Sequence, residues 1–224
     1  MFVFILFSFF VHGSHFSSID FNTTIRLQDH ISSRFDYAFS ALSDIGKVEI
    51  MTIFLLVTLI FARKLVGGIV TIVSYGVFHL IEIYGKFFVS HKPPPEFMLR
   101  TKRIIDFPQF TVRLENSYPS GHAGRTLFIS TILIILIFQS KRLSKSAKII
   151  LTALIICFDI TMLVSRIYLG EHWMSDVIGG AVLGGSLGFL SAGFLIGKSS
   201  KSAVSTQKTQ RPNNFFGFRL VRDH

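Results

Sequence analysis

The sequence contains a single cysteine, Cys157, in 224 residues. A lone cysteine excludes an intrachain disulfide and a metal site built from several thiolates. Charged residues are also scarce, at 16% of the chain, against about 25% in soluble domains. Half of the residues are apolar. The composition is therefore that of a membrane protein, and its length suits one domain of several spans.

Acidic residues are outnumbered by basic ones, 13 to 23, which gives a formal net charge of +10. A basic chain can bind nucleic acid. In membrane proteins, however, Lys and Arg collect in short cytoplasmic loops and tails, and that explains the charge without a polyanion. We therefore expect membrane lipids, and no nucleic acid, as partners.

Six apolar segments predict an all-α bundle of six transmembrane helices. The first, Phe2–Val11, is about half as long as a spanning helix, even if it extends to Phe16. A signal peptide begins with positively charged residues, and none precedes this segment. We therefore expect a short span or anchor. The other five spans are predicted at Val48–Ala62, Leu65–Phe88, His122–Gln139, Ile149–Tyr168 and Met174–Gly197.

We expect residues 1–197 to form a single integral membrane domain whose core motifs lie between residues 86 and 176. The basic residues 198–224 are expected to form a flexible cytoplasmic tail. Residues 17–47 are mixed in polarity. They predict either an amphipathic helix at the membrane interface or a connector packed outside the bilayer.

The distribution of basic residues predicts how the spans are oriented. Six spans put Arg63, Lys64, the loop 140–148 and the tail on one side, which the positive-inside rule assigns to the cytoplasm. The loop 89–121 and the connection 169–173 then share the extracytoplasmic face, in the cytoplasmic membrane of a prokaryotic cell. The loop 89–121 is also basic, although the rule predicts few basic residues on that side. We therefore expect its cations to bind an anion.

A polar turn runs directly into the fourth span. Pro119 and Gly121 are typical of a turn, and Ser120 can cap the helix that follows. The free backbone N–H groups of such a helix start favour an anion. His122 and Arg125 would be costly in lipid, which makes them functional candidates at the mouth of the helix.

A second polar cluster lies between the fifth and sixth spans. His172 and Asp176 are four residues apart and share a helical face. A carboxylate at that spacing can bind one imidazole nitrogen, fix the tautomer and leave the other nitrogen free to attack. Arg166 carries a forked set of donors that matches the geometry of phosphate.

The third predicted span carries His79, Glu82 and Lys86 on one helical face. Such a polar stripe favours a helix that faces a protein-lined site. The alternative is that Glu82 and Lys86 are a structural ion pair at the membrane boundary. Asp159 is expected to be a structural partner and His79 a buried structural histidine. No role is predicted for five other histidines: His12, His15, His30, His91 and His224.

Two of these patterns together resemble the type-2 phosphatidic acid phosphatase superfamily. They are Pro119-Ser120-Gly121-His122 and, further along, Ser165-Arg166-x5-His172-x3-Asp176. The superfamily includes membrane lipid phosphate phosphatases, soluble acid phosphatases and vanadium haloperoxidases. The resemblance is to the membrane branch, and it implies six spans with an extracytoplasmic loop that carries part of the active site.

The resemblance also implies roles for individual residues. His172 would be the nucleophile that forms a phosphohistidine, and Asp176 would orient it. His122 would be the general acid for the departing oxygen. The phosphoryl oxygens would be held by Arg166, Ser120 and the backbone amide of Gly121. Neither a metal nor another cofactor is required.

A third motif of the family is present only in altered form. A lysine, six residues and an Arg-Pro pair are expected upstream. Lys86 is the predicted motif lysine, and Arg100 is the predicted second cation, with Lys92 as the alternative because Pro93 follows it. Arg125 is predicted either to bind a second phosphate or to pair with Glu82 or Asp159 inside the bundle.

The predicted function is hydrolysis of a lipid phosphate or diphosphate at the outer face of the membrane. Candidate substrates are phosphatidic acid, phosphatidylglycerol phosphate, diacylglycerol pyrophosphate and polyprenyl diphosphate. Two alternatives remain: a phosphotransferase that uses the same residues, and a non-catalytic lipid-binding or transport protein.

Overall fold

The structure is a computed structural model that describes residues 1–102 and 115–196. The predicted tail 198–224 and the middle of the basic loop lie outside the described residues. The described part is all-helical and contains no strand. This confirms the predicted fold class of a helical membrane bundle.

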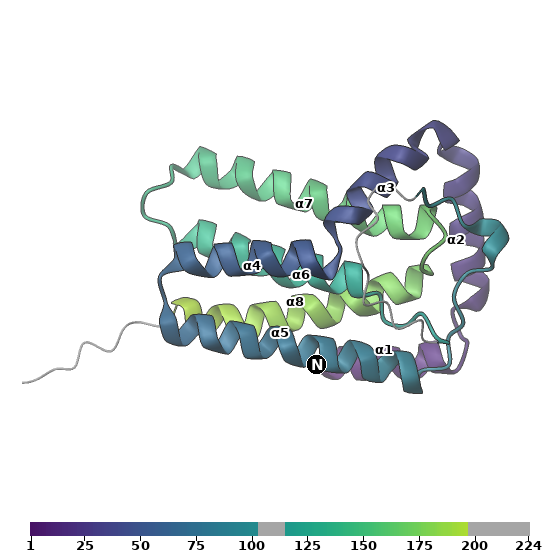
Figure 1. The fold of residues 1–224 in the computed structure, drawn as a ribbon, viewed down its shortest axis with the longest axis horizontal. Helices are drawn as coiled ribbons and strands as arrows, with labels where there is room; N and C mark the ends of the chain where they lie inside the picture. The colour runs from purple at the N-terminus through teal and green to yellow at the C-terminus, as the bar shows by residue number, and fades with distance from the viewer. Residues whose placement is uncertain (103–114, 197–224) are drawn as a thin grey trace, which may run out of the picture.

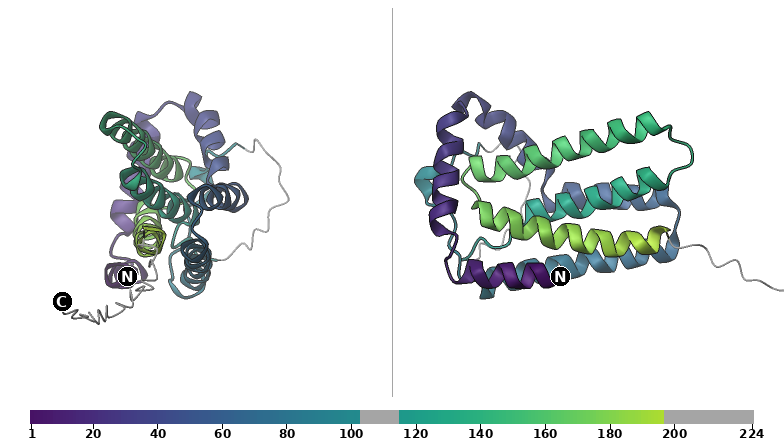
Figure 2. Two further views of the ribbon diagram at one scale, coloured as in Figure 1. Left: turned by 90° about the vertical axis from the view of Figure 1, so that its left-hand side faces the viewer. Right: turned by 180° about the vertical axis from the view of Figure 1, so that it is seen from behind.

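Five long helices lie side by side and form the bundle (Figures 1 and 2). They are α4 (Val48–Ala62), α5 (Leu65–Phe88), α6 (Gly121–Gln139), α7 (Lys145–Tyr168) and α8 (Met174–Ile196). The described residues form three further α-helices, α1 (Phe2–His12), α2 (Ser17–His30) and α3 (Asp36–Ile45). Two short 3-10 helices, η1 (Ser33–Phe35) and η2 (Glu96–Met98), lie in the connections.

Four helices, α5 to α8, are each long and apolar enough to cross a membrane. Two further pairs qualify only when the bent pair is taken as one span. The first is α1 with α2, bent by 91°, and the second is Ser33–Ile45 with α4, bent by 52°. The described residues therefore hold four to six candidate spans, against the six that were predicted.

The helix α2 lies across one end of the bundle (Figure 1). Its polar residues Asp20, Thr24 and Gln28 are buried against protein. On a helix that faces lipid, such residues would be costly. The Gln28 amide donates hydrogen bonds to the carbonyl oxygens of Met98 at 2.7 Å and Tyr168 at 2.9 Å. This part of the 17–47 segment is therefore a connector packed on the bundle.

The tightest helix pair is α6 against α8. Both helices are lined by glycines, which permit close backbone contact between helices. A Cβ atom added to Gly184 would lie 1.9 Å from the carbonyl oxygen of Gly124. At the end of this contact the Ser120 amide donates to the carbonyl oxygen of Asp176 at 3.0 Å. The packing thereby joins the two motifs found in the sequence.

Candidate active site

The polar residues of the two motifs gather at the end of the bundle that α2 covers. There α5 and α7 end, while α6 and α8 begin (Figure 1). The connection between α7 and α8 depends on Gly170, whose φ of +68° favours glycine. A Cβ atom at this position would also lie 2.3 Å from the carbonyl oxygen of Met98. This close turn places His172 just before the first turn of α8.

His172 and Asp176 meet as their spacing predicted. The Nδ1 atom of His172 lies 3.4 Å from Oδ2 of Asp176, and the backbone N–H of Trp173 donates to the same oxygen at 3.0 Å. An ionised carboxylate only accepts hydrogen bonds, so Nδ1 of His172 carries the proton, and in a neutral ring Nε2 keeps its lone pair. Burial lowers the pKa of His172 from its ordinary value of 6.5, although Asp176 acts in the opposite direction. The lowered pKa favours a neutral imidazole.

Ser120 caps α6 by position and is buried, with 1% of its surface exposed. Its Oγ atom has no hydrogen-bond partner among the described residues. The next residue, Gly121, packs directly on Glu82 of α5, because a Cβ atom there would lie 2.0 Å from Oε1. A buried hydroxyl without a partner is costly, and it adjoins the free N–H groups of a helix start, which suit an anion.

Arg166 is fully buried near the end of α7. Its guanidinium contacts the hydroxyl of Ser43 and the carboxylate of Glu171. Within residues 1–102 and 115–196, its Nε atom has no hydrogen-bond partner. A buried guanidinium with an unused donor can donate a hydrogen bond to an oxygen of a bound phosphate.

His122 lies in the first turn of α6, and its ring packs on the hinge between α3 and α4. A Cβ atom at Gly46 would lie 2.7 Å from its Cδ2 atom. Arg166 and His172 are both close enough to act electrostatically on His122, and Arg166 acts on His172 as well. The two histidines and Arg166, predicted from separate motifs, thus belong to one charged cluster.

Lys86 and Arg125 both bind Glu82. Lys86 Nζ lies 2.8 Å from Oε1 and Arg125 Nη1 lies 3.2 Å from Oε2 of this carboxylate. Arg125 also donates from Nε to the carbonyl oxygen of Gly46 at 3.2 Å. Of the two predicted roles of Arg125, the structure shows the ion pair with Glu82. The Glu82–Lys86 pair is also present, and Lys86 lies close enough to act on both His122 and His172.

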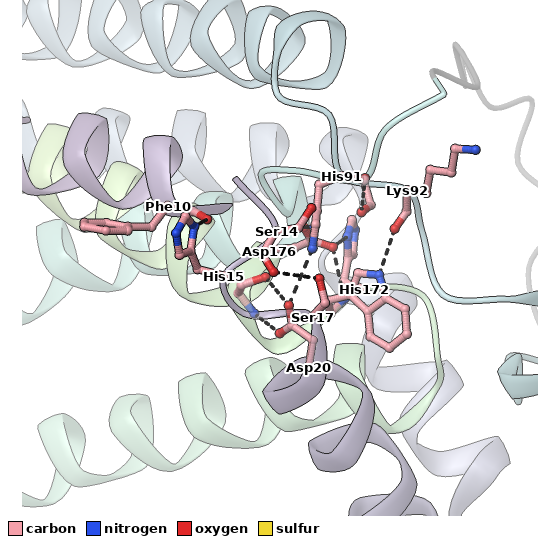
Figure 3. A network of polar contacts seen from close by, with 12 residues as sticks. Phe10, Ser14, His15, Ser17, Asp20, His91, Lys92, His172 and Asp176 are labelled. Carbon is pink, nitrogen blue, oxygen red and sulfur yellow. Dashed lines mark hydrogen bonds and ion pairs between the residues drawn. The ribbon is translucent and has the colours of Figure 1, made fainter. Parts of the chain in front are cut away.

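The two candidates for the second cation, Arg100 and Lys92, make their contacts with other groups. The Arg100 guanidinium donates to the hydroxyl of Tyr168 at 3.3 Å, and its Cζ lies 5.3 Å from the centre of that ring. Lys92 is exposed, and its side chain points away from His172 (Figure 3). Its backbone carbonyl oxygen instead accepts from the indole of Trp173 at 2.7 Å.

Two residues that sequence reasoning left without a role lie in contact with the motifs. His91 donates to Asp176, and Asp20 contacts both His91 and Ser175 (Figure 3). His91 lies 85 residues before Asp176, so no local spacing could reveal the contact. For Asp20, the only indication in the sequence was a charged residue within the segment of mixed polarity, 17–47.

The described residues contain no group of three or more His, Cys, Asp or Glu side chains arranged to hold a metal ion. The imidazoles of His91 and His172 both contact the carboxylate of Asp176 directly. Arg166 and the start of α6 are the groups placed to receive an anion.

Comparison with known families gives a clear result: the family described as the PAP2 superfamily matches residues 54–197. The chain belongs to the PAP2 superfamily. This match covers α5 to α8 and both sequence motifs. The resemblance found from the motifs is confirmed.

Two relatives have similar sequences. An undecaprenyl-diphosphatase of Sulfolobus acidocaldarius is 32% identical over 133 residues, which are 59% of this chain and 57% of that protein. A phosphatidylglycerophosphatase B of Bacillus subtilis is 31% identical over 137 residues, 60% of this chain and 61% of that protein. The similarity thus spans about three fifths of each relative.

Two solved structures share the fold. A transmembrane PAP2-type phosphatidylglycerolphosphate phosphatase from Bacillus subtilis superposes with a TM-score of 0.68 at 19% identity, covering 86% of this chain and 92% of that one. Aquifex aeolicus LpxE superposes with a TM-score of 0.57 at 21% identity, over 77% and 94%. Together with the apolar helices, they identify an integral membrane protein with the fold of membrane PAP2 proteins.

Proposed function

We propose that this protein hydrolyses a lipid phosphate or diphosphate through a phosphohistidine on His172. The observation that carries the proposal is the contact between His172 Nδ1 and Asp176, with buried, unpaired polar atoms of Ser120 and Arg166 beside it. The names of the two sequence relatives, a diphosphatase and a phosphatase of lipids, support this substrate class.

The reaction has two steps. In the first, the lone pair of His172 Nε2 attacks phosphorus, and a bond forms as the bond from phosphorus to the leaving oxygen breaks. A proton from His122 passes to that leaving oxygen. In the second, water attacks the phosphohistidine while His122 takes a proton from the water. Phosphate leaves, and His172 is neutral again.

Charge on the three other phosphoryl oxygens is neutralised by groups that are already in place. Arg166 offers its unused Nε donor, Ser120 its hydroxyl, and the start of α6 its backbone N–H groups beginning at Gly121. Preorganised donors of this kind stabilise transition-state charge most effectively in a site that excludes water. Cationic side chains and amides thus carry the role that a metal has in other phosphatases.

We assign the hydrocarbon tail of the substrate to an apolar cavity of about 370 Å³ between α4, α6 and α7. Ile129, Leu133 and Phe158 are among its lining residues. Thr126, also in the lining, lies one helical turn beyond His122 on α6. A head group at the mouth of α6 would therefore direct its tail into this cavity.

A bulkier lining residue tests the tail assignment. Leu133→Trp is expected to raise KM several-fold for a long-chain lipid phosphate and to leave a short-chain, water-soluble analogue unaffected. Ile160→Trp on α7, where the native side chain is 57% exposed, is the matched control and should change neither. Equal losses on both substrates would contradict the assignment.

The active site is proposed to face the extracytoplasmic side of a prokaryotic cytoplasmic membrane. The connections from α4 to α5 and from α6 to α7 lie at the opposite end of the bundle (Figure 1). By the helix bounds, they carry Arg63, Lys64, Lys141 and Arg142. By the positive-inside rule these belong to the cytoplasm. The same rule places the tail 198–224 there.

The decisive assay is phosphate release by the purified protein from a panel of lipid phosphates and diphosphates. We expect release from at least one of them, and a loss of about a thousandfold or more in His172→Ala. Undiminished release by that variant would exclude His172 as the nucleophile. Release from no substrate would favour a binding or transport protein, and transfer to an added alcohol in preference to water would indicate a phosphotransferase.

A further inference from the structure

The carboxylate of Asp176 is shared between two histidines. Its Oδ2 atom faces His172, while its Oδ1 atom lies 2.7 Å from Nδ1 of His91. The contact to His91 is the shorter of the two by 0.7 Å (3.4 − 2.7). Figure 3 shows Asp176 between the two rings. The residue that orients the nucleophile is therefore itself held by a second imidazole.

A second carboxylate lies on the far side of His91. Asp20 of α2 has its Oδ2 atom 3.5 Å from Nε2 of His91. Asp20 is fixed in turn by the backbone N–H of Ser175 at 2.8 Å and by the Ser175 hydroxyl at 2.7 Å. His91 thus bridges Asp20 and Asp176, and Ser175, next to Asp176 in the chain, closes the ring of contacts.

All three members of this bridge are buried. The exposed fractions are 8% for His91, 1% for Asp20 and 0% for Asp176. Two buried carboxylates without a cation between them would repel each other and lose their hydration. An imidazolium can donate to both at once, because each of its nitrogens carries a proton.

The charge state of His91 fits this arrangement. Burial acts to lower the pKa of His91, but the hydrogen bonds to Asp176 and Asp20 outweigh it and raise the pKa to about 9. His91 is therefore a cation at neutral pH, and the bridge of three residues carries a net charge of −1.

We propose that His91 is a positioning residue for the nucleophile: its imidazolium fixes Asp176 against His172 and offsets part of the carboxylate charge that His172 experiences. The inference rests on the proposed phosphohistidine function. Its effect passes through Asp176 alone, and His91 need not touch the substrate.

The electrostatic consequence concerns the protonation of His172. The charged groups that act on His172 are Asp176, Arg166 of α7 and Lys86 of α5, while those facing His91 are Asp176 and Asp20. Without the His91 cation, the full negative charge of Asp176 would favour protonation of His172. A protonated imidazole has no lone pair for phosphorus. As the pH is lowered, the variant would therefore lose its nucleophile at a higher pH than the wild-type protein does.

A purely structural role for His91 is the alternative. Its contact with Asp20 joins α2 to the connection after α5, and its backbone carbonyl accepts from the amide of Ser117 at 2.9 Å. A residue that only joins these two segments needs the contact between Nε2 and Asp20. A positioning residue needs the link between Nδ1 and Asp176.

Two substitutions separate these links. In His91→Asn the side-chain amide nitrogen can take the place of Nδ1 and keep the donor toward Asp176. In His91→Gln it can take the place of Nε2 and keep the donor toward Asp20. Both variants lose the positive charge. The purified variants are compared in kcat, KM, the pH profile of kcat/KM, and thermal unfolding in detergent.

We expect His91→Gln to lower kcat by about tenfold, the low end of the loss found when the hydrogen-bond partner that orients a metal-binding histidine is removed, with KM within twofold of wild type. The kcat of His91→Asn should be at least threefold higher than that of His91→Gln. In both variants the acidic limb of kcat/KM should move to higher pH, by about 0.5 to 1 unit. Equal kcat losses in the two variants, or an acidic limb that stays in place in both, would overturn the proposal.

The test also distinguishes this inference from the proposed function. If His172→Ala abolishes phosphate release while both His91 variants keep the wild-type kcat and pH profile, the nucleophile assignment stands and the role of His91 falls. If His172→Ala retains full activity, the phosphohistidine mechanism fails, and the role of His91 fails with it.

Discussion

At the scale of single residues, the proposed phosphate site is marked by polar atoms without partners. Ser120 Oγ is buried and, among the described residues, makes no hydrogen bond. We therefore expect Ser120→Ala to leave thermal stability unchanged or slightly higher, because no hydrogen bond is lost. Activity should fall by about tenfold to a hundredfold, since one donor to the transition state is removed.

Ser130→Ala is the matched control for this substitution, because the Ser130 hydroxyl donates to Asp159 at 2.6 Å. The control should destabilise the protein by about 1 kcal/mol through the lost hydrogen bond. A Ser120→Ala protein with full activity and lowered stability would show that the hydroxyl has a structural role instead.

The same scale yields a prediction about stability and pH. The pKa of His91 rises from 6.5 to about 9 on folding, through its contacts with Asp176 and Asp20. A raised pKa in the folded state means that the imidazolium stabilises the protein fully below pH 6.5, and that this contribution is lost as the pH rises through 9.

The thermal midpoint of the wild-type protein should therefore fall over this pH range by more than that of His91→Asn, which has no titrating group at position 91. The measurement is thermal unfolding in detergent at several pH values. Parallel curves for the two proteins would contradict the ionised bridge.

At the scale of helices, the site depends on how closely α6 approaches α8. A Cβ atom at Gly184 would lie 1.9 Å from the Gly124 carbonyl oxygen, whereas one at Gly193, on the same helix, meets nothing within 4 Å. Gly184→Ala is expected to push the helices apart and to cost about 1–3 kcal/mol of stability. Phosphate release should also fall, since the bond from Ser120 to Asp176 joins the same two helices.

Gly193→Ala provides the internal comparison for this pair. Alanine favours helix over glycine by up to about 1 kcal/mol, so this variant should be at least as stable as wild type and equally active. Thermal unfolding and phosphate release measured side by side decide the matter. Equal behaviour of the two variants would contradict the close packing of α6 on α8.

The helices differ in how well the sequence predicted them. The bounds of α4 and α5 match the predicted spans at both ends, Val48–Ala62 and Leu65–Phe88, because long apolar runs bounded by Arg63 and Lys64 leave little freedom. The start of α7 at Lys145 was missed by four residues, since its first turn is polar and capped by Ser144. The bend of 91° between α1 and α2 lies at Gly13 and Ser14, which are typical turn residues. This pair marks the turn but does not give its angle.

The candidate site shows the same division. The pairing of His172 with Asp176 follows from a spacing of four residues across the start of α8, which the sequence displays. The bridge from Asp176 through His91 to Asp20 joins α8, the connection after α5, and α2. These contacts exist only after the helices have packed, so no pattern within one segment could predict them.

At the scale of the whole molecule, the two ends of the bundle should face opposite sides of the membrane. We expect a cysteine at Phe97 in η2, which is 78% exposed at the site end, to react with a membrane-impermeant thiol reagent added to intact cells. A cysteine at Lys141, at the opposite end, should react only after the cells are opened. Both variants are made in a Cys157→Ser background, because the native thiol is exposed on α7. The reverse labelling pattern would place the site in the cytoplasm.

The central claim is that His172 accepts the phosphoryl group. The most direct measurement is rapid alkaline quenching during turnover of a lipid phosphate, followed by mass spectrometry of the peptide that contains His172. We predict a phosphoryl group on His172 in the wild-type protein. His122→Ala, which lacks the proposed general acid and base for the two steps, serves as a second sample. Turnover with phosphate on another residue, or with no phosphorylated peptide under conditions that preserve phosphohistidine, would contradict the mechanism.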